Sequence, residues 1–378
     1  MADLRDTDGK PIPGGDPNSE DVAWLEPSHL AIPAWRQRIY DRLEDAGRFR
    51  SAVLFTALAG MFATSFPITI LTIALAPIAD EFDAPETTLA WVISAPMLLS
   101  ACFFPLLGKL GDLRGHRKVF LAGFTGATLV AALTAFAWDE YSLIGFRALA
   151  AILGGATQPT SMALIFSVYP PEERVRAMGW WSMTTAAAPA LGVAIGGPLV
   201  DLVGWRIVFL LQAGLSLCAL ALAFAVLRET TPKRVRFDFA GSIALALGIG
   251  GLMFALGSLR SENVSALLVG SSVAVGILSL LLFVAIEKRV KDPLLPLAFF
   301  RARNFSATLV TNAMTSSAYM GAFVIAPLYL QNLGYTATLI AFMILMRTGA
   351  LTLASPIGGR IGEAWGERKA SIFGCAIM

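Results

Sequence analysis

Ten apolar runs, each long enough to form a membrane-spanning helix, dominate this sequence and limit the folds that it can adopt. A helix needs about 20 successive apolar residues to cross a bilayer. Short turn-rich or charged segments separate the runs, as is typical between spans. We place the spans at residues 53–78, 88–108, 118–138, 142–167, 178–200, 206–227, 239–259, 264–286, 306–330 and 337–361. An eleventh run begins at Ala370 and is interrupted at Met378, so we expect this chain to be part of a longer protein.

Composition excludes a water-soluble globular enzyme, because 56% of the residues are hydrophobic, only 15% are charged and the mean hydropathy is +0.66. The net charge of +2 provides no basic field for nucleic acid. The three cysteines and two histidines are too scattered for a disulfide framework, a metal site or a hydrolase centre. We therefore expect no enzymatic activity, no cofactor and no metal.

Basic residues predict the orientation of the spans, because lysine and arginine gather in cytoplasmic loops. Of the 29 lysines and arginines, 25 fall in the amino-terminal tail and the even-numbered loops, whereas the odd-numbered loops hold only Arg206 and Arg260. One missing or extra span would scramble this alternation, so the count supports ten crossings. We expect a multi-pass protein of the plasma membrane with a cytoplasmic amino terminus.

The first 50 residues form a polar tail without the features of a signal peptide. Near its end, Trp35, Ile39 and Leu43 repeat at helical spacing among five arginines. This pattern favours a short helix lying on an anionic membrane surface. A solvated linker is the alternative.

A glycine-rich basic turn occurs twice, after the second span and after the tenth. The two copies agree in glycine spacing, in the position of an acidic residue and in a closing Arg-Lys pair, which predicts an internal duplication of the kind found in many transporters. Glycines let helices approach closely, and Gly115 permits a turn conformation that other residues avoid. The predicted conformational gate comprises Gly108, Asp112, Gly115, Arg117 and Lys118 and their counterparts Gly359, Glu363, Gly366, Arg368 and Lys369. A plain basic hairpin is the alternative.

The first copy of this turn resembles the signature between the second and third helices of the major facilitator superfamily, and the likeness covers residues 51–378. Gly204, Trp205, Arg206 and Phe209 resemble the start of the sixth helix in the drug-efflux branch. The two spans between the duplicated halves are what its fourteen-helix drug/proton antiporters would imply. The resemblance implies an all-α membrane bundle, with two pseudo-symmetric six-helix bundles and two inserted helices.

On this resemblance the chain divides into four parts. We expect a cytoplasmic tail with an interfacial helix at 1–50, the amino-terminal bundle at 51–230, the inserted helices at 231–290 and the start of an incomplete carboxyl-terminal bundle at 291–378.

Two motifs depart from the pattern of that branch. In the first span Pro67 stands where the branch carries an acid. In the fifth span Val193 replaces an expected proline, and we expect the neighbouring small residues to serve helix packing: Gly192, Gly196, Gly197 and Pro198. No carboxylate falls at mid-depth in any span, so proton coupling is not evident; Asp112, Asp201 and Glu363 are predicted to come closest to burial.

Two arginines fall within spans, and an unpaired guanidinium in hydrocarbon costs several kcal/mol. We expect Arg147 and Arg347 to face a polar cavity and to make the pathway positive, which favours anionic or electron-rich substrates, so that Arg347→Gln would cripple transport of an anion. Arg147 resembles the fourth-helix arginine of the family, which is tied to substrate or proton handling. Snorkelling of Arg147 and a structural partner for Arg347 are the alternatives.

The remaining candidates for the substrate or proton pathway are polar residues inside the spans: Thr69, Thr72, Gln158, Asn312 and Tyr319. Interhelical hydrogen bonding is the alternative role for each of them.

These observations predict a secondary active transporter that works as a monomer in the bilayer by alternating access. Efflux of a small organic compound or drug, with protons as a candidate coupling ion, is the leading hypothesis. A transporter of an anionic metabolite without the usual proton antiport is the alternative. A membrane sensor derived from a carrier is the alternative from another class.

Overall fold

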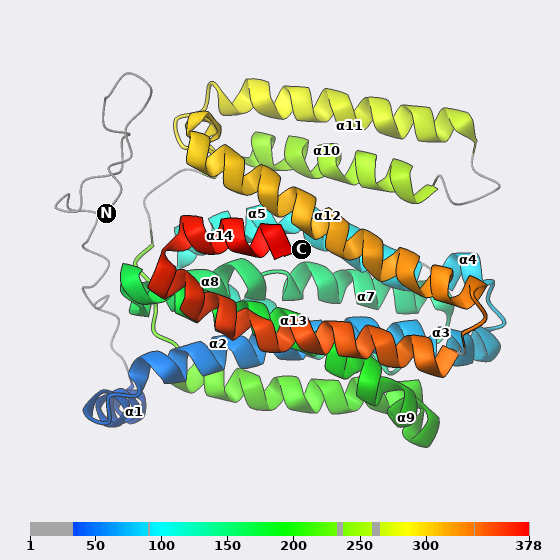
Figure 1. Cartoon of the computed structure of the whole chain (residues 1–378), viewed down its shortest axis with the longest axis horizontal. Helices are drawn as coiled ribbons and strands as arrows, with labels where there is room; N and C mark the ends of the chain where they lie inside the picture. Colours follow the sequence, from blue (N-terminus) through cyan, green and yellow to red (C-terminus); the bar gives the residue numbers. More distant parts are fainter. Residues whose placement is uncertain (1–32, 90, 233–236, 259–264, 336, 378) are drawn as a thin grey trace.

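The structure is a computed structural model that describes residues 33–89, 91–232, 237–258, 265–335 and 337–377. These residues form helices and short connections, with no strand among them. Most of the long helices run along a common direction (Figure 1). The prediction of an all-α bundle is confirmed.

Each predicted span is helical over most of its described part, and the non-helical residues include 135–138 and 155–156. The helices of the first six spans are α2 (Phe49–Ser65), α3 (Pro67–Phe82), α4 (Glu86–Leu89), α5 (Trp91–Arg114), α6 (His116–Thr134), α7 (Glu140–Gly154), α8 (Thr157–Val168) and α9 (Pro171–Val226). They are followed by α10 (Phe239–Ser258), α11 (Ala266–Glu287), the short 3-10 helix η2 (Leu297–Arg301), α12 (Arg303–Asn332), α13 (Ala337–Trp365) and α14 (Glu367–Ile377).

Breaks within the helices occur at proline and glycine. The first span divides at Phe66, because Pro67 has no N–H to donate to the carbonyl of Ala63 one turn earlier. Helix α9 contains two predicted spans, which are separated by Gly204 with a φ of 78°. A positive φ is favourable for glycine alone, so the chain turns between the fifth and sixth spans where the sequence predicted.

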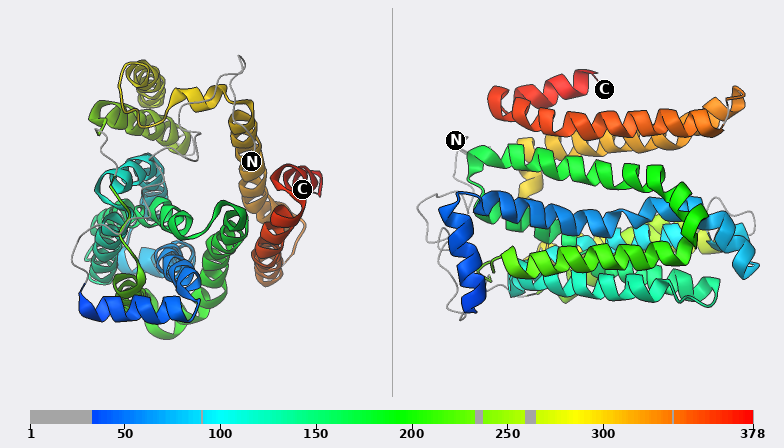
Figure 2. Two further views of the ribbon diagram at one scale, coloured as in Figure 1. Left: turned by 90° about the vertical axis from the view of Figure 1, so that its left-hand side faces the viewer. Right: turned by 90° about the horizontal axis from the view of Figure 1, so that it is seen from below.

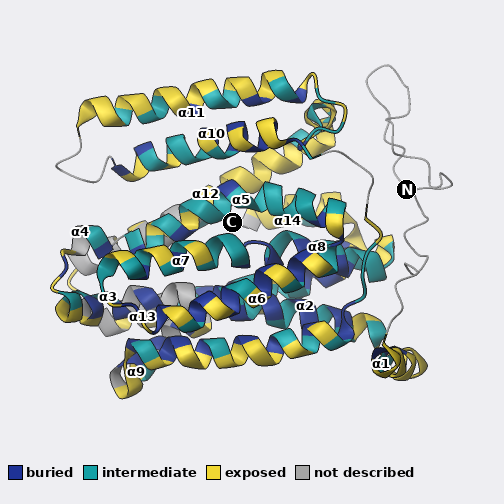
Figure 3. Ribbon diagram, turned by 180° about the vertical axis from the view of Figure 1, so that it is seen from behind, coloured by how far each residue is buried: buried dark blue, intermediate teal, exposed yellow. Residues whose placement is uncertain are grey.

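Five helical segments among the described residues are long and apolar enough to cross a membrane: Trp91–Arg114, Glu140–Val168, Leu202–Val226, Phe239–Ser258 and Ala266–Glu287. Large apolar side chains cover the outer surfaces of α10 and α11 (Figure 3), as expected for helices that face lipid. The other predicted spans include one that is divided at Phe66, and ten crossings stay a prediction.

The core lies inside the bundle formed by α2 to α9. Phe120 and Phe124 of α6 are fully buried against α2, α8 and the second half of α9. The hairpin of α10 and α11 packs on α5, where Trp91 stacks on Phe254 with ring centroids 5.8 Å apart. Helix α13 lies alongside the first half of α9 (Figure 2). Two packed units therefore flank the amino-terminal bundle.

Helix α1 (Ala34–Asp45) lies across one end of the bundle, transverse to the long helices (Figure 2). Arg36 donates a hydrogen bond to the carbonyl oxygen of Leu227 over 2.8 Å, and the Tyr40 hydroxyl donates to the same oxygen over 3.1 Å. Trp35 is 47% exposed and stacks on Phe224. The predicted helix is confirmed, and its contact with a membrane surface stays a prediction.

At the opposite end of the bundle, a charged network joins α3, α6 and α9. The carboxylate of Glu81 accepts hydrogen bonds from the indole of Trp205 over 2.7 Å and from two nitrogens of Arg206 over 2.7 and 3.1 Å. Arg206 also donates to the carbonyl oxygens of Ala135 and Ala137, each over 2.8 Å. Partial burial opposes ionisation, but the hydrogen bonds from Arg206 and Trp205 outweigh it and lower the pKa of Glu81.

This network predicts a loss of stability in acid. Because folding lowers the pKa of Glu81 below 4.5, the ionised pair stabilises the fold fully above pH 4.5, and this contribution disappears as the pH falls through the folded pKa. Glu81 is 42% exposed, so the contribution is modest, below about 1 kcal/mol. Glu81→Gln is expected to flatten the fall in thermal stability between pH 6 and 3, measured in nanodiscs. Glu172→Gln, at an exposed position, is the control; an unchanged pH profile in Glu81→Gln would contradict the prediction.

Candidate functional site

A cavity of about 490 Å³ lies within the amino-terminal bundle, among α2, α5, α6, α7, α8 and α9. Its wall is largely apolar, with Ile93, Met97 and Phe104 from α5. Its polar lining includes Thr64, Thr157, Gln158, Arg147, Gln212 and Ser216. An apolar wall with a few polar groups is typical of a small-molecule site, and the volume falls in the usual range.

Arg147 is the only charged side chain among the described residues that line this cavity, and it is 7% exposed. Its Nε has no hydrogen-bond partner, and none of the ion pairs formed by the described side chains includes it. Its guanidinium carbon lies 5.7 Å from the centre of the Phe209 ring. A buried guanidinium with an unpartnered Nε and an aromatic ring beside it can bind an anion.

The start of α7 sets the position of Arg147. Asp139 accepts a hydrogen bond from the backbone N–H of Ser142 over 2.7 Å, and the Ser142 hydroxyl oxygen accepts one from the N–H of Asp139 over 3.1 Å. This reciprocal capping box satisfies free donors at the helix start and fixes where α7 begins. Arg147 follows Leu143 by four residues, so both lie on the buried face of α7.

The predicted pathway residues do not all meet in this cavity. Arg147 and Gln158 line it, whereas Arg347, Tyr319 and Asn312 are not among its described lining residues. Arg347 instead donates a hydrogen bond over 2.7 Å to the carbonyl oxygen of Tyr319 and lies 4.4 Å from the centre of its ring. Asn312 is exposed on α12. The side chains of Thr69 and Thr72 lie outside the described residues.

Sequence analysis missed several polar residues of the cavity, including Thr64 and Thr157. It also missed Gln212 and Ser216, which are 7% and 2% exposed. The sequence could have indicated Gln212 and Ser216, because they are polar residues four apart in the apolar sixth span and therefore share one helix face.

The prediction about buried acids was wrong for the described side chains. Asp238 and Glu287 are the buried carboxylates, at 6% and 5% exposure, whereas Glu363 is exposed and Asp112 is half-buried; the side chain of Asp201 lies outside the described residues. Asp238 accepts from the N–H of Gly241 at the start of α10, and Glu287 accepts from two backbone N–H groups after α11. Both carboxylates are thus hydrogen-bonded to backbone N–H groups, and no hydropathy pattern reports these bonds.

The first copy of the repeated turn joins α5 to α6. Gly115 has a φ of 96°, which confirms the predicted turn conformation, and a Cβ there would collide with the carboxylate of Glu229. Glu229 accepts a hydrogen bond from the N–H of Arg117 over 3.1 Å, so a negative charge lies at the positive end of α6. Asp112 lies 3.5 Å from His116, one helical turn later.

The other predicted residues of this copy contribute less. Arg117 donates to the carbonyl oxygen of Phe224 over 3.2 Å and lies over its ring. Gly108 is half-buried with ordinary clearance toward Pro159, and Lys118 is exposed. The turn therefore ties α6 to the end of α9.

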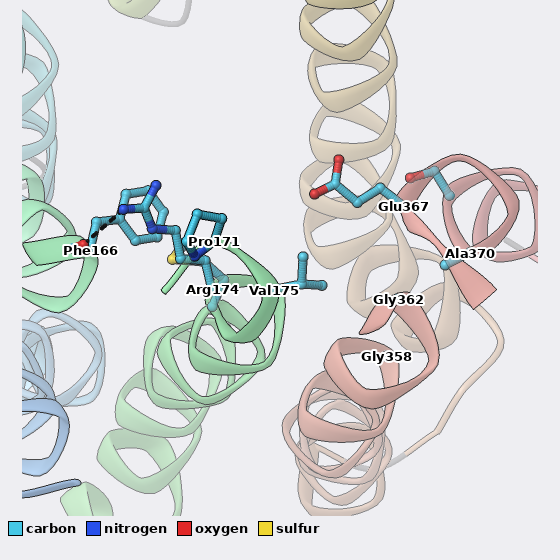
Figure 4. A pocket seen from close by; sticks show the side chains of 10 residues that line it. Phe166, Pro171, Arg174, Val175, Gly358, Gly362, Glu367 and Ala370 are labelled. Carbon is cyan, nitrogen blue, oxygen red and sulfur yellow. Dashed lines mark hydrogen bonds between the residues drawn. The ribbon is translucent and has the colours of Figure 1, made fainter. Parts of the chain in front are cut away.

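The second copy lies between α13 and α14. Gly366 has a φ of 83°, matching Gly115, while Glu363, Arg368 and Lys369 are exposed. Gly359 lies against α9, where a Cβ would come within 3.1 Å of the Cα of Gly179. A pocket of about 680 Å³ opens beside this contact, with Arg174 on one wall and Glu367 on the other (Figure 4).

Both copies lie at the end of the bundle that α1 crosses. Glu229, next to the first copy, follows Leu227, which α1 contacts through Arg36. Arg50 at the start of α2 pairs with Glu173 at the start of α9 over 3.4 Å, two residues before Val175, which contacts the second copy. Their role as a conformational gate stays a prediction.

The small residues of the fifth span stand in a continuous helix. Gly192 and Gly196 are buried, Pro198 is exposed, and the surroundings of Gly197 lie outside the described residues. Among the described residues of α9, non-helical φ and ψ occur at Gly204, and the predicted packing role suits Gly192 and Gly196, which are buried.

Comparison with known proteins places this architecture in a family. The family model of the Major Facilitator Superfamily matches residues 57–378. The chain is 31% identical to the probable multidrug resistance protein EmrY of Escherichia coli over 78% of this chain and 58% of the relative. It is 28% identical to the tetracenomycin C resistance and export protein of Streptomyces glaucescens, over 83% and 59%. It is 30% identical to the fatty acid resistance protein FarB of Neisseria gonorrhoeae, over 80% and 61%.

The chain thus spans about three fifths of the length of these relatives. The family match, the helical architecture and the paired glycine turns agree with one another. The chain belongs to the Major Facilitator Superfamily, a family of multi-pass membrane transporters.

Proposed function

We propose that this protein is a secondary transporter that exports small organic compounds from the cell by alternating access. The observation that carries the proposal is the 490 Å³ cavity between family-type helices, with apolar walls and a few inward polar groups. The names of the relatives support export, since they include a multidrug resistance protein and a tetracenomycin C export protein.

The substrate class favoured by the cavity is organic anions with an apolar body. Arg147 supplies a buried positive charge with no described carboxylate paired to it, and the wall around it is apolar. A fatty acid resistance protein is among the relatives, and a fatty acid combines a carboxylate with an apolar chain. This observation also favours the second candidate, transport of an anionic metabolite without the family's usual proton antiport. The roles of Arg347, Tyr319, Asn312, Thr69 and Thr72 in the pathway remain part of the proposal.

The proposed orientation places α1, both glycine turns and the amino terminus in the cytoplasm of a cell whose plasma membrane holds the protein. The basic residues of the tail and of the even-numbered loops support it. We also propose a monomer as the working unit and protons as the candidate coupling ion.

Counterflow in proteoliposomes tests the proposal. The protein that is reconstituted is the natural form, as its own cells produce it. We expect accumulation of labelled aromatic and long-chain carboxylates against unlabelled substrate. Repeating the assay with an imposed proton gradient separates proton antiport, which would change the rate, from uncoupled anion exchange, which would not. Protein that is folded and reconstituted but moves no member of a broad panel of anions, cations and neutral drugs would overturn the proposal in favour of a carrier-derived sensor.

A further inference from the structure

Gln212 holds a backbone carbonyl that Pro67 leaves without its helical donor. In a regular helix the carbonyl of Ala63 would accept the N–H of residue 67, but proline has none. The Gln212 side chain donates its Nε2 to this oxygen over 3.4 Å. Because a carbonyl oxygen only accepts, this contact fixes which way the amide points.

The fixed amide leaves an acceptor without a donor at the cavity wall. Gln212 is 7% exposed and lines the cavity, and its Oε1 is buried without a hydrogen-bond partner. A buried amide oxygen without a donor is costly, so a ligand that supplies one gains affinity.

Arg147 lines the same cavity as this acceptor. Its guanidinium contacts Phe209, which precedes Gln212 by three residues on α9 and therefore shares its helix face. Both side chains are more than nine-tenths buried, and both line the same cavity. The cavity wall thus holds a cationic donor and an acceptor whose direction is set by the backbone.

We propose that Arg147 and Gln212 together form a subsite for organic anions that also carry a hydroxyl or N–H group, the anion binding Arg147 and the donor binding the Oε1 of Gln212. Pro67 is the positioning residue, because it obliges Gln212 to donate to Ala63 and so to present its oxygen to the ligand. This inference rests on the proposed function and adds a selectivity for donor-bearing anions.

The test compares hydroxybenzoates with their methoxybenzoate counterparts, using the 2-, 3- and 4-isomers. Each methoxy compound keeps the carboxylate and the size but lacks the donor. We expect purified protein in nanodiscs to bind at least one hydroxy isomer about tenfold more tightly than its methoxy partner, by titration calorimetry. In Gln212→Met, which preserves side-chain length, this ratio is expected to fall to about one while methoxybenzoate still binds.

Pro67→Ala provides a second, independent variant. It restores an N–H to the carbonyl of Ala63 and releases the Gln212 amide, so the ratio is expected to fall although Gln212 is unchanged. Gln37→Met makes the same substitution as Gln212→Met on exposed α1, where Gln37 bonds Asp41, and is expected to leave the ratio at the wild-type value.

The outcomes separate the two proposals. A wild-type ratio near one, with both compounds bound, would overturn the subsite and leave the proposed function standing, as would an unchanged ratio in Gln212→Met. Failure of the wild-type protein to bind any of the carboxylates would overturn anion recognition and this subsite together.

Discussion

Arg147→Gln is expected to reduce transport of a carboxylate substrate by about 100-fold while leaving the protein at least as thermally stable as the wild type. The reduction follows from losing a charge-assisted hydrogen bond in a cavity shielded from water, where such bonds contribute about 1.5 to 3 kcal/mol. The stability follows from the burial of Arg147 without a described carboxylate partner, since removing an uncompensated charge from a low-dielectric interior relieves a desolvation cost.

Initial rates in proteoliposomes and melting curves of the same preparations measure both effects. Arg38→Gln, on the exposed side of α1, makes the same chemical change away from the cavity and is expected to match the wild type in both assays. A variant that melts lower than the wild type but transports the carboxylate as fast would show that Arg147 is a structural residue.

Gly359→Val is the second change with a large expected effect, namely loss of most transport with a lower melting temperature. Helices α9 and α13 approach so closely that a Cβ at Gly359 would lie 3.1 Å from the Cα of Gly179 and 3.2 Å from the carbonyl oxygen of Val175. Backbone atoms cannot move aside as a flexible side chain can, so valine must force the helices apart. Overpacking of this kind typically costs about 1 to 3 kcal/mol.

The neighbouring glycine provides a matched control. Gly358 is exposed and has no atom within 4 Å of the position of a Cβ, so Gly358→Val is expected to keep both transport and melting temperature. Equal behaviour of the two variants in melting curves and counterflow would show that the contact between α9 and α13 does not require glycine at position 359.

Much of the fold follows from local properties of the sequence. The ten apolar runs are helical over most of their described parts, and the breaks at Pro67 and Gly204 are explained by a missing N–H and by a positive φ. The two repeated turns place glycines at positive φ, at Gly115 and Gly366, as their matching spacing predicted for the first copy. These features depend on residues close together in the chain, so hydropathy, proline and glycine report them directly.

The candidate site is formed by residues that lie far apart in the sequence, so local patterns could not predict it in full. Both arginines within spans were expected to face a polar cavity, yet Arg147 lines one and Arg347 bonds the carbonyl oxygen of Tyr319. A similar difference separates the exposed Glu363 from the buried Glu287, which satisfies two backbone N–H groups. Neither difference in surroundings can be predicted from the residues within one helical turn.

Sequence by itself thus determined that the apolar runs form helices and that the chain turns at matched glycines, because apolar run length and glycine spacing are local properties. Only the tertiary structure decided which polar groups face the cavity. The pairing of Gln212 with the carbonyl of Ala63 joins residues 149 positions apart, and no pattern along the chain specifies it. Because this contact is buried, the orientation of one amide sets which ligand groups can form hydrogen bonds in the cavity.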